Sequence, residues 1–493
     1  MPSARNVTAL RRRLLRTVVL SAALTGSTVL PAAAAAADDA PTTVVGRLVQ
    51  AWAEAEPAAV AAGEEAEGPI SWVQPADGDA VRIETAGVGD IPAGSTVSVT
   101  VTPNGDGGQD GEQVLGADLL ALPAEQPVLS DPAGLTNQVT TVLVRPGGVA
   151  ADSVTQAQLV GAVTGPVADF WSEQTGDAVR IGVRDSRDWT VTTADCSDAT
   201  KLWNEVAAKV GFVAGPGKHL LLYVSGAATG CSYALAEVGA KPATGGRLYV
   251  SDLQPSAIAH ELGHNFGLGH SSGLQCADAV ETGTCRTAGY RDYYDVMGAS
   301  WARMGSLNAP QAARLNVLPA AQQRSMAVTD AATTVTLAPL ASRSGTRALR
   351  LTDAAGTVYW LEYRTATLRD RWLGTGDNSY RLETGVLLHR SGALPDTSVL
   401  LDGTPGPAAG WARDFQAALP VGSPVGVSGA NFSVVVDRVS AAGAVLTVTP
   451  TAPADGQATT APAPDVAAVP GSVMAGQDAP AAPAAAAPPQ TVP

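Results

Sequence analysis

The sequence predicts an α+β protein in which a mixed α/β region lies between two β-rich regions. Strand-like and helical segments alternate between residues 137 and 320, whereas short β-branched runs with turn residues between them dominate on both sides. The chain has 493 residues, more than one hydrophobic core usually serves, so several folded units are expected.

The N-terminal segment predicts export from the cell. Four arginines within residues 11–16 precede an apolar run over residues 17–30 that ends in small residues, which is typical of a secretory signal peptide, here residues 1–37. Arg11 and Arg12 also suit a twin-arginine signal, so both export routes stay open. The run is shorter than the roughly 20 residues of a spanning helix. We therefore expect a secreted, extracellular protein without stable membrane insertion after cleavage.

Residues 38–136 predict a β-rich unit, either a propeptide or an accessory domain. Strand-like runs occur at residues 80–84 and 95–102, and a short helical stretch is expected at residues 48–55. Residues 104–112 are rich in acids and glycine, but their spacing fails the EF-hand loop. We interpret them as a solvated turn, and calcium dependence stays open.

Residues 137–320 predict the central mixed domain. Pro255 suits the first turn of a helix because its fixed φ is compatible with that position. The expected strands are residues 138–145, 178–184, 219–224, 231–238 and 247–251, and the expected helices are residues 153–175, 197–210 and one beginning at Pro255.

Residues 321–450 predict a β-sandwich-like domain, and residues 451–493 predict a disordered tail. The tail is mostly Ala, Pro, Thr and Gly, which offer too little apolar surface to offset the entropy of ordering. The strand-like runs of the sandwich are residues 333–337, 348–351, 358–363, 385–389, 432–439 and 444–448.

The cysteine count indicates an oxidising environment, and the net charge disfavours two classes of binding partner. An even number of cysteines in an exported chain predicts two disulfides among three connectivities, and sequence order favours Cys196–Cys231 with Cys276–Cys285. The net charge is −15, which argues against nucleic acid or an anionic membrane surface as a partner. Nothing in the sequence indicates an oligomeric state.

Residues 260–270 read His-Glu-Leu-Gly-His-Asn-Phe-Gly-Leu-Gly-His and carry three of the five histidines in the chain. His260 and His264 are four residues apart, so on a helix both imidazoles can reach one zinc ion at about 2.0–2.1 Å. Glu261 lies one residue further round, where its carboxylate can act as a general base on water. His270 is six residues beyond His264, so the helix must end first, and Gly267 can supply that turn.

Three neutral imidazoles leave one tetrahedral position for water, which is the arrangement of a catalytic zinc site. Two plainer interpretations stay open: ordinary helix and loop histidines, or a closed structural zinc site. The other histidines, His219 and His389, lie in strand-like runs, and we expect them to be packed or surface residues.

The motif resembles that of the metzincin clan of zinc peptidases, whose HExxHxxGxxH pattern matches residues 260–270 at every fixed position. Asp295-Val296-Met297-Gly298 is similar to the clan's Met-turn, which implies that Met297 packs beneath the zinc site as an apolar floor. The details are closest to the gametolysin-like family, through Asn265, Gly267-Leu268, Ser271, the form of the Met-turn, and the stretch 307–315.

The resemblance implies a secreted zinc-dependent endopeptidase with one catalytic ion and a protein or peptide substrate. It also implies that an extended peptide adds to the edge strand near residues 231–238. Tyr290, Tyr293 and Tyr294 either line the substrate pocket, donate to the oxyanion, or only pack. No cysteine precedes residue 137, so a thiolate latency switch is excluded. The alternatives are an extracellular binding or adhesion protein with an inert zinc domain, and a hydrolase of non-peptide amides.

Overall fold

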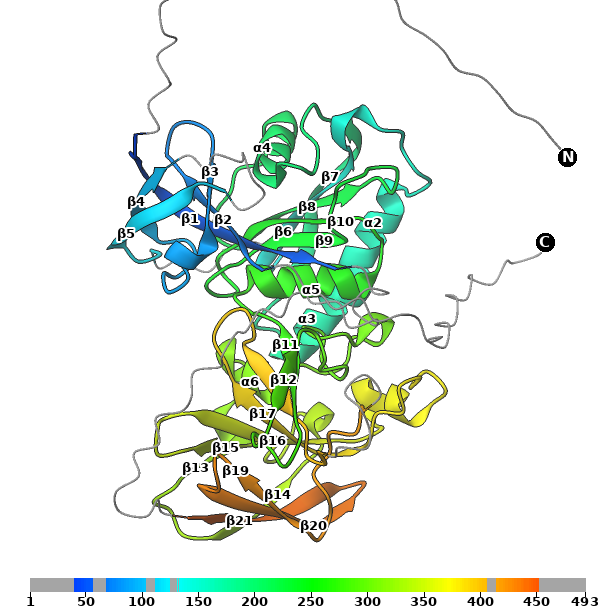
Figure 1. Cartoon of the computed structure of the whole chain (residues 1–493). Coiled ribbons are helices and arrows are strands. Elements are labelled where there is room, and N and C mark those ends of the chain that lie inside the picture. Colours follow the sequence, from blue (N-terminus) through cyan, green and yellow to red (C-terminus); the bar gives the residue numbers. More distant parts are fainter. Residues whose placement is uncertain are drawn as a thin grey trace, which may run out of the picture.

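The computed structural model describes residues 40–55, 68–102, 111–124, 131, 133–405 and 414–451. Its fold is mixed α+β, with mostly sheet and few helices (Figure 1). The predicted signal peptide, the tail after residue 451 and most of the acidic stretch at 104–112 lie outside these residues.

The largest sheet in the described part of the chain joins the N-terminal and central regions. Its strand order is β3-β2-β1-β9-β10-β8-β6-β7, and β4 pairs with both β1 and β5. Strands β6, β7, β8 and β10 are parallel, while β9 is antiparallel to β10. The strands are β1 Thr42–Glu54, β2 Ile70–Gln74, β3 Val81–Ile83, β4 Thr96–Thr102, β5 Gln113–Ala121, β6 Asn137–Arg145, β7 Ile181–Val191, β8 Lys218–Val224, β9 Ala234–Glu237 and β10 Gly246–Val250.

Strand β1 corrects two sequence-based expectations. The helix predicted at residues 48–55 is wrong, because all but the last of these residues belong to β1. Its final four residues, Ala51 to Glu54, pair antiparallel with β9, and its earlier residues pair with β2 and β4. Partners on both sides outweigh the helical preference of an alanine-containing segment. Since β1 covers β9, the free edge expected near residues 231–238 is absent from the described structure.

The helices lie on both faces of this sheet. The predicted helix over residues 153–175 is divided by a π-helical turn at Val163–Val167 that contains Pro166, whose missing N–H cannot join the regular hydrogen-bond ladder. The α-helices are α2 Gln156–Ala162, α3 Ala168–Thr175, α4 Ala199–Val210, α5 Pro255–Asn265 and α6 Ala309–Arg314.

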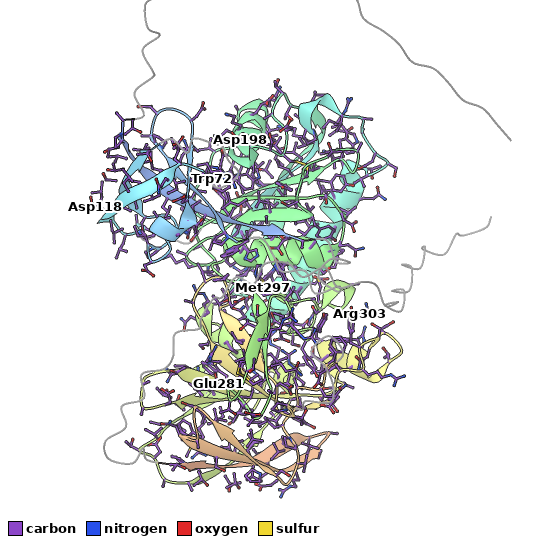
Figure 2. All side chains as sticks on the ribbon, in the orientation of Figure 1. Trp72, Asp118, Asp198, Glu281, Met297 and Arg303 are labelled. Carbon is purple, nitrogen blue, oxygen red and sulfur yellow. A yellow bond between two sulfur atoms is a disulfide. The ribbon has the colours of Figure 1, made fainter. Side chains whose placement is uncertain are left out.

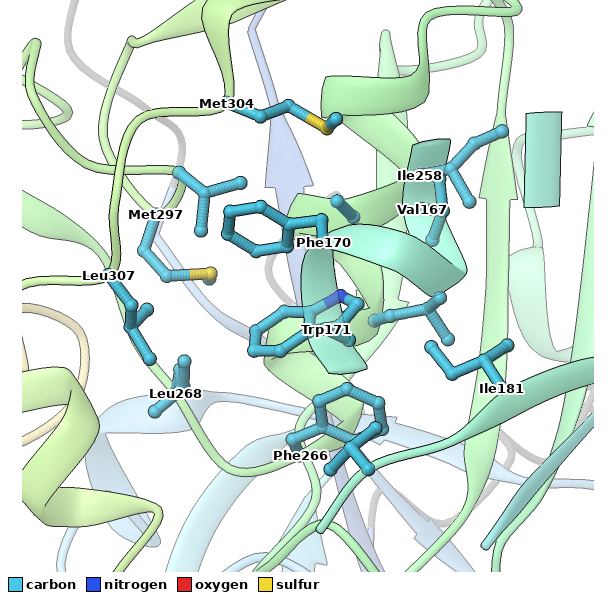
Figure 3. Packing of buried hydrophobic residues seen from close by; sticks show 14 of the residues in the cluster. Val167, Phe170, Trp171, Ile181, Ile258, Phe266, Leu268, Met297, Met304 and Leu307 are labelled. Atoms are coloured by element: carbon cyan, nitrogen blue, oxygen red, sulfur yellow. The ribbon is translucent and has the colours of Figure 1, made fainter. Parts of the chain in front are cut away.

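The core beneath α5 is built around aromatic side chains. The Trp171 ring of α3 meets Phe170 and Phe266 edge to face, with ring centroids 5.2 and 4.9 Å apart, a favourable arrangement of ring quadrupoles. Met297 and Leu307 close the same cluster from the other side (Figure 3). Helix α5 is thereby fixed against the sheet, while α4 packs on the opposite face through Leu202, Trp203 and Val206.

Two further sheets pack face to face in the C-terminal region and share one apolar core. The first has the order β12-β11-β18-β17-β16-β15-β13, and the second β14-β21-β20-β19. These strands are β11 Ser271–Cys276, β12 Cys285–Ala288, β13 Gln323–Ala327, β14 Thr333–Leu337, β15 Ala348–Thr352, β16 Val358–Arg364, β17 Gly385–Ser391, β18 Ser398–Leu401, β19 Pro424–Val427, β20 Phe432–Ser440 and β21 Gly443–Pro450.

Strand pairing connects the regions that the sequence predicts as separate domains. Strand β11 begins directly after His270 and pairs in parallel with β18, so the central region contributes to a C-terminal sheet. The domain limits at residues 136, 320 and 450 stay a prediction. Disulfides join Cys196 to Cys231 and Cys276 to Cys285. Within the described ranges, no helix is long and apolar enough to cross a membrane.

Candidate metal centre

Helix α5 presents two histidines toward one point. His260 and His264 are four residues apart on this helix, and their ring centroids lie 4.8 Å apart. Ile258 and Leu262 belong to the apolar core that fixes the helix against the sheet. The amphipathic pattern therefore orients the imidazoles as well as the helix.

The helix ends in a Schellman turn at Gly267. The Gly267 N–H donates to the His264 carbonyl at 2.9 Å, and the Leu268 N–H donates to the Gly263 carbonyl at 3.0 Å, which is the hydrogen-bond pair of that motif. Gly267 has φ +96°, and a Cβ there would lie 2.9 Å from the Ala240 carbonyl. Only glycine fits this turn without strain.

The chain returns through Gly269 and brings His270 to the other two histidines. The Nε2 atoms of His260, His264 and His270 lie 3.6, 3.1 and 3.2 Å from one oxygen, Oε1 of Glu54. All four side chains are buried, and their potential ligand atoms lie within 4.8 Å of one another. Figure 1 shows the end of β1 beside α5.

Backbone carbonyls set the orientation of two of the rings. His260 Nδ1 donates to the Val296 carbonyl at 2.8 Å, and His264 Nδ1 donates to the Leu268 carbonyl at 2.9 Å. A carbonyl oxygen can only accept, so Nδ1 of each ring carries a proton, and Nε2, which faces the cluster centre, would offer its lone pair to a metal ion when the ring is neutral. This is the tautomer that a metal-binding histidine requires.

His270 is held by contacts from the N-terminal and C-terminal regions. Its backbone N–H donates to the Pro395 carbonyl at 2.7 Å. Its ring centroid lies 5.5 Å from that of Trp52 in β1 and 4.2 Å from that of Tyr290. Gly269 is required here, since a Cβ at this position would lie 2.1 Å from the Pro395 carbonyl oxygen.

Met297 lies against the backbone of α5 between the two helical histidines. It is fully buried, and a Cβ on Gly263 would lie 2.3 Å from its sulfur. Figure 3 shows Met297 facing the cluster that contains Phe170. The neighbouring Val296 carbonyl orients His260, so this turn both supports and aligns the site.

Helix α6 braces the loop that connects His264 to His270. Arg314 Nε donates to the Gly267 carbonyl at 2.7 Å, and Gln311 Nε2 donates to the Gly269 carbonyl at 2.9 Å. Asn308 caps α6 and also donates to Ser271 Oγ at 3.1 Å. The stretch 307–315 is thus tied to the histidine motif by direct hydrogen bonds.

Glu261 is buried beside the histidines, and neither carboxylate oxygen has a hydrogen-bond partner among the described residues. Burial raises the pKa of Glu261 well above its ordinary value, and the charge of Glu54 raises it further. Positive charge at the cluster centre would lower that pKa and favour the carboxylate. The carboxylate lines a pocket together with Glu54, Tyr233, Ser256, His260 and Tyr290.

The pKa of Glu54 is shifted in the opposite direction from that of Glu261. Burial raises its pKa, but the charges of His260 and His270 and hydrogen bonds from His260 and His264 outweigh burial and hold the pKa well below its ordinary value. An ionised carboxylate therefore faces a cluster of imidazole nitrogens in a buried setting, which is costly unless it is neutralised by positive charge.

The donor set fits one zinc ion. Three imidazole nitrogens and a carboxylate oxygen, which lie within 4.8 Å of one another, are ligands that zinc accepts in tetrahedral geometry. The carbonyl partners of His260 and His264 complete the arrangement usual around metal-bound histidine.

Tyr290, Tyr293 and Tyr294 have different surroundings in the structure. Only Tyr290 lines the pocket; burial raises its pKa well above the ordinary value, and the charge of Glu54 adds to this. Its φ is +59°, a strained conformation for a bulky residue that often marks a functional site. Tyr293 packs against Phe415 and Tyr380, and Tyr294 donates to the Glu383 carbonyl at 3.0 Å.

The remaining histidines are buried in hydrogen-bond networks away from the cluster. His219 Nδ1 donates to Asn265 Oδ1 at 2.9 Å, and His389 Nε2 pairs with Asp292 Oδ2 at 3.0 Å. Asn265 in turn donates to the Glu237 carbonyl at 2.7 Å, which ties the end of α5 to β9. Both histidines act as packed residues.

Sequence reasoning missed Glu54. It lies 210 residues before His264, in a segment whose alanines suggested a helix. The valines and threonines at the start of β1 could have indicated a strand. No local pattern could have paired that strand with β9 or placed its last carboxylate among the histidines.

No family profile matches this sequence, and no curated protein matches it. A solved structure titled metalloproteinase-II from Bacteroides fragilis is 13% identical, with a TM-score of 0.23, over 50% of this chain and 75% of that chain. A chaperone–substrate complex is 14% identical, with a TM-score of 0.20, over 40% of this chain, so the chain spans only 29% of that protein's length. Such low TM-scores leave the chemistry to be argued from the residues of the site.

Proposed function

We propose that this chain is a secreted zinc-dependent endopeptidase of the metzincin type, similar to the gametolysin-like family. The observation that supports it most is the convergence of three imidazole Nε2 atoms beside a buried carboxylate that has no hydrogen-bond partner among the described residues. Under this proposal His260, His264 and His270 are the zinc ligands and Glu261 is the general base. The two disulfides are compatible with export to an oxidising compartment.

A zinc ion held by the three histidines would polarise a peptide carbonyl and acidify water in the pocket. Glu261 takes the proton from the attacking water and delivers it to the departing amine, since its carboxylate lines the pocket without another partner. Tyr290 stays protonated because its pKa is raised, so its hydroxyl can donate to the oxygen on which negative charge develops. Met297 and the Val296 carbonyl keep His260 in position.

The peptide substrate would bind along β9 as an added antiparallel strand. In the structure the end of β1 pairs with β9 in this way, with Trp52 opposite Ala236 and Glu54 opposite Ala234. Backbone pairing of this kind gives affinity with little dependence on side chains, which suits a protein substrate.

The decisive experiment compares casein hydrolysis by the chain with that by Glu261→Gln, after loading each with zinc and cutting each between β5 and β6 so that β1 no longer covers β9. We expect the variant to bind zinc as the wild type does and to lose about three orders of magnitude or more in kcat, because only the base is removed. His219→Gln serves as a control for a buried substitution outside the pocket. Unchanged hydrolysis by Glu261→Gln would reject the mechanism. Zinc binding without any hydrolysis of casein or gelatin would favour an inert binding protein or an amidase with another substrate.

A further inference from the structure

We propose that β1 is a built-in inhibitor of the peptidase, with its main chain filling the peptide-binding edge of β9 and the Glu54 carboxylate taking the fourth ligand position. This inference rests on the proposed function. It assigns residues 40–124 to a latency unit, which hydrolysis of one peptide bond between β5 and β6 would release.

The main chain of β1 uses the hydrogen-bonding groups that a substrate would need. Residues Ala51 to Glu54 pair with β9. The Val238 N–H donates to the Gln50 carbonyl at 2.8 Å, and the Tyr233 N–H donates to the Glu54 carbonyl at 3.0 Å. No extended peptide can pair with this side of β9 while β1 remains there, because each backbone group serves one neighbouring strand per side.

The Glu54 side chain occupies the position between the three histidines that a water or a substrate oxygen would need. Its Oε1 lies 3.1 and 3.2 Å from Nε2 of His264 and His270 and 3.6 Å from Nε2 of His260. A zinc ion bound by three imidazoles keeps one open position in a catalytic site. A carboxylate oxygen in that position would exclude both water and a substrate carbonyl.

Trp52 anchors β1 through apolar and aromatic contacts. Its side chain is buried with Ala93 and Val238 and contacts Leu394 of the C-terminal region, and its ring lies against that of His270. Side chains alternate along β1, so Trp52 and Glu54 point to the same face and reach the histidine cluster together. The fit of both residues argues for a specific inhibitory contact.

Release of the unit would leave the support of the site intact. The apolar cluster beneath α5 contains no residue before Val139 among those described. Val97, Val99 and Val101 of β4 belong to a separate cluster with Leu48 and Val73. On the opposite face of the sheet, Val49, Ala51, Ala53 and Trp72, the last labelled in Figure 2, share a cluster with Leu202 and Trp203 of α4. Removal of the unit therefore exposes β9 and part of the α4 face, but it does not open the core under the histidines.

The test uses the full chain with cobalt in place of zinc, because cobalt absorption reports the ligands of the site. Acetohydroxamate, a small chelating probe, is added to wild type, to Glu54→Gln and to the matched control Asp118→Ala, an exposed carboxylate of the same unit. We expect the probe to change the spectrum of Glu54→Gln at concentrations about tenfold or more below those needed for wild type or Asp118→Ala. Equal probe binding by all three proteins would overturn the role of Glu54.

A second experiment tests whether β1 blocks peptide hydrolysis. A specific protease site is inserted between β5 and β6, and the chain is cut and fractionated by size. We expect peptide hydrolysis by the central fragment to exceed that of the intact chain by about tenfold or more, as expected when the competent state is rare before the cut. Full hydrolysis by the intact chain would contradict inhibition. If the probe result depends on Glu54 but the cut protein hydrolyses no peptide, the ligand assignment stands and the proposed peptidase function fails.

Discussion

At the scale of single residues, hydrogen-bond partners and burial set the protonation state of a buried histidine, as His219 shows. The neutral ring donates from Nδ1 to Asn265, and its Nε2 accepts from Asn137 Nδ2 at 3.0 Å. Burial lowers the pKa of His219 to about 4, against a small opposing effect of Asn265. Protonation would place an N–H against the Asn137 amide, so the folded state disfavours the charged ring.

This pKa predicts acid sensitivity. The unfolded chain binds a proton at His219 below about pH 6.5, whereas the folded chain does so only near pH 4. The contribution is therefore complete above pH 6.5 and is lost as the pH falls toward 4, by up to about 3 kcal/mol. Urea unfolding of wild type and His219→Gln at pH 7.5 and pH 4.5 measures this. Equal pH dependence in both proteins would show that His219 does not titrate in this way.

The proposed role of Tyr290 as a donor to the oxyanion can be tested by removing its hydroxyl. Tyr290→Phe removes only the hydroxyl, so we expect kcat of the activated enzyme to fall by about 100-fold with little change in KM. Tyr294→Phe is the matched control, since its hydroxyl donates to the Glu383 carbonyl away from the pocket. A KM effect alone would assign Tyr290 to substrate binding.

At the scale of elements, the turn at the end of α5 determines whether His260, His264 and His270 can meet. Gly267→Ala would force a side chain into a left-handed backbone conformation and against the Ala240 carbonyl. We expect a loss of roughly 2 kcal/mol or more in unfolding free energy, together with weaker zinc binding. Gly161→Ala, in α2 and free of neighbours within 4 Å, should be neutral or slightly stabilising. Equal stability of the two variants would refute the role assigned to the turn.

Local sequence predicted α5, the histidine spacing and the need for a turn, because each depends on residues within one or two helical turns. The strands β6, β8, β10 and most of those in the C-terminal sheets were predicted from β-branched runs. What local sequence could not predict is pairing across long separations. The strand pair β1–β9, the contact of Pro395 with His270 and the position of Glu54 all depend on segments brought together by the fold.

At the scale of the molecule, the candidate site lies where three regions meet. Helix α5 supplies two histidines, β1 supplies Glu54, and the segment around Pro395 holds the backbone of His270. Strand β11 follows His270 directly and pairs with β18. The C-terminal sheets therefore help to position the histidines of the candidate metal centre.

This arrangement predicts that the C-terminal region is needed for metal binding. A chain ending at residue 320 lacks β18 and Pro395, so we expect zinc content well below one ion per chain after dialysis, because the third ligand loses its support. A chain ending at residue 451 keeps every described contact of His270 and should bind zinc as the full chain does. Full zinc content in the shorter chain would show that His270 is positioned without the C-terminal sheets.

The most direct test of the whole account is a crystal structure of the zinc-loaded full chain with anomalous scattering measured at the zinc edge. We predict one strong anomalous peak at about 2.0–2.1 Å from Nε2 of His260, His264 and His270, in contact with a Glu54 oxygen and with Glu261 beside it. No peak between these rings, or imidazoles that point away from one another, would contradict the metal centre and the function proposed from it.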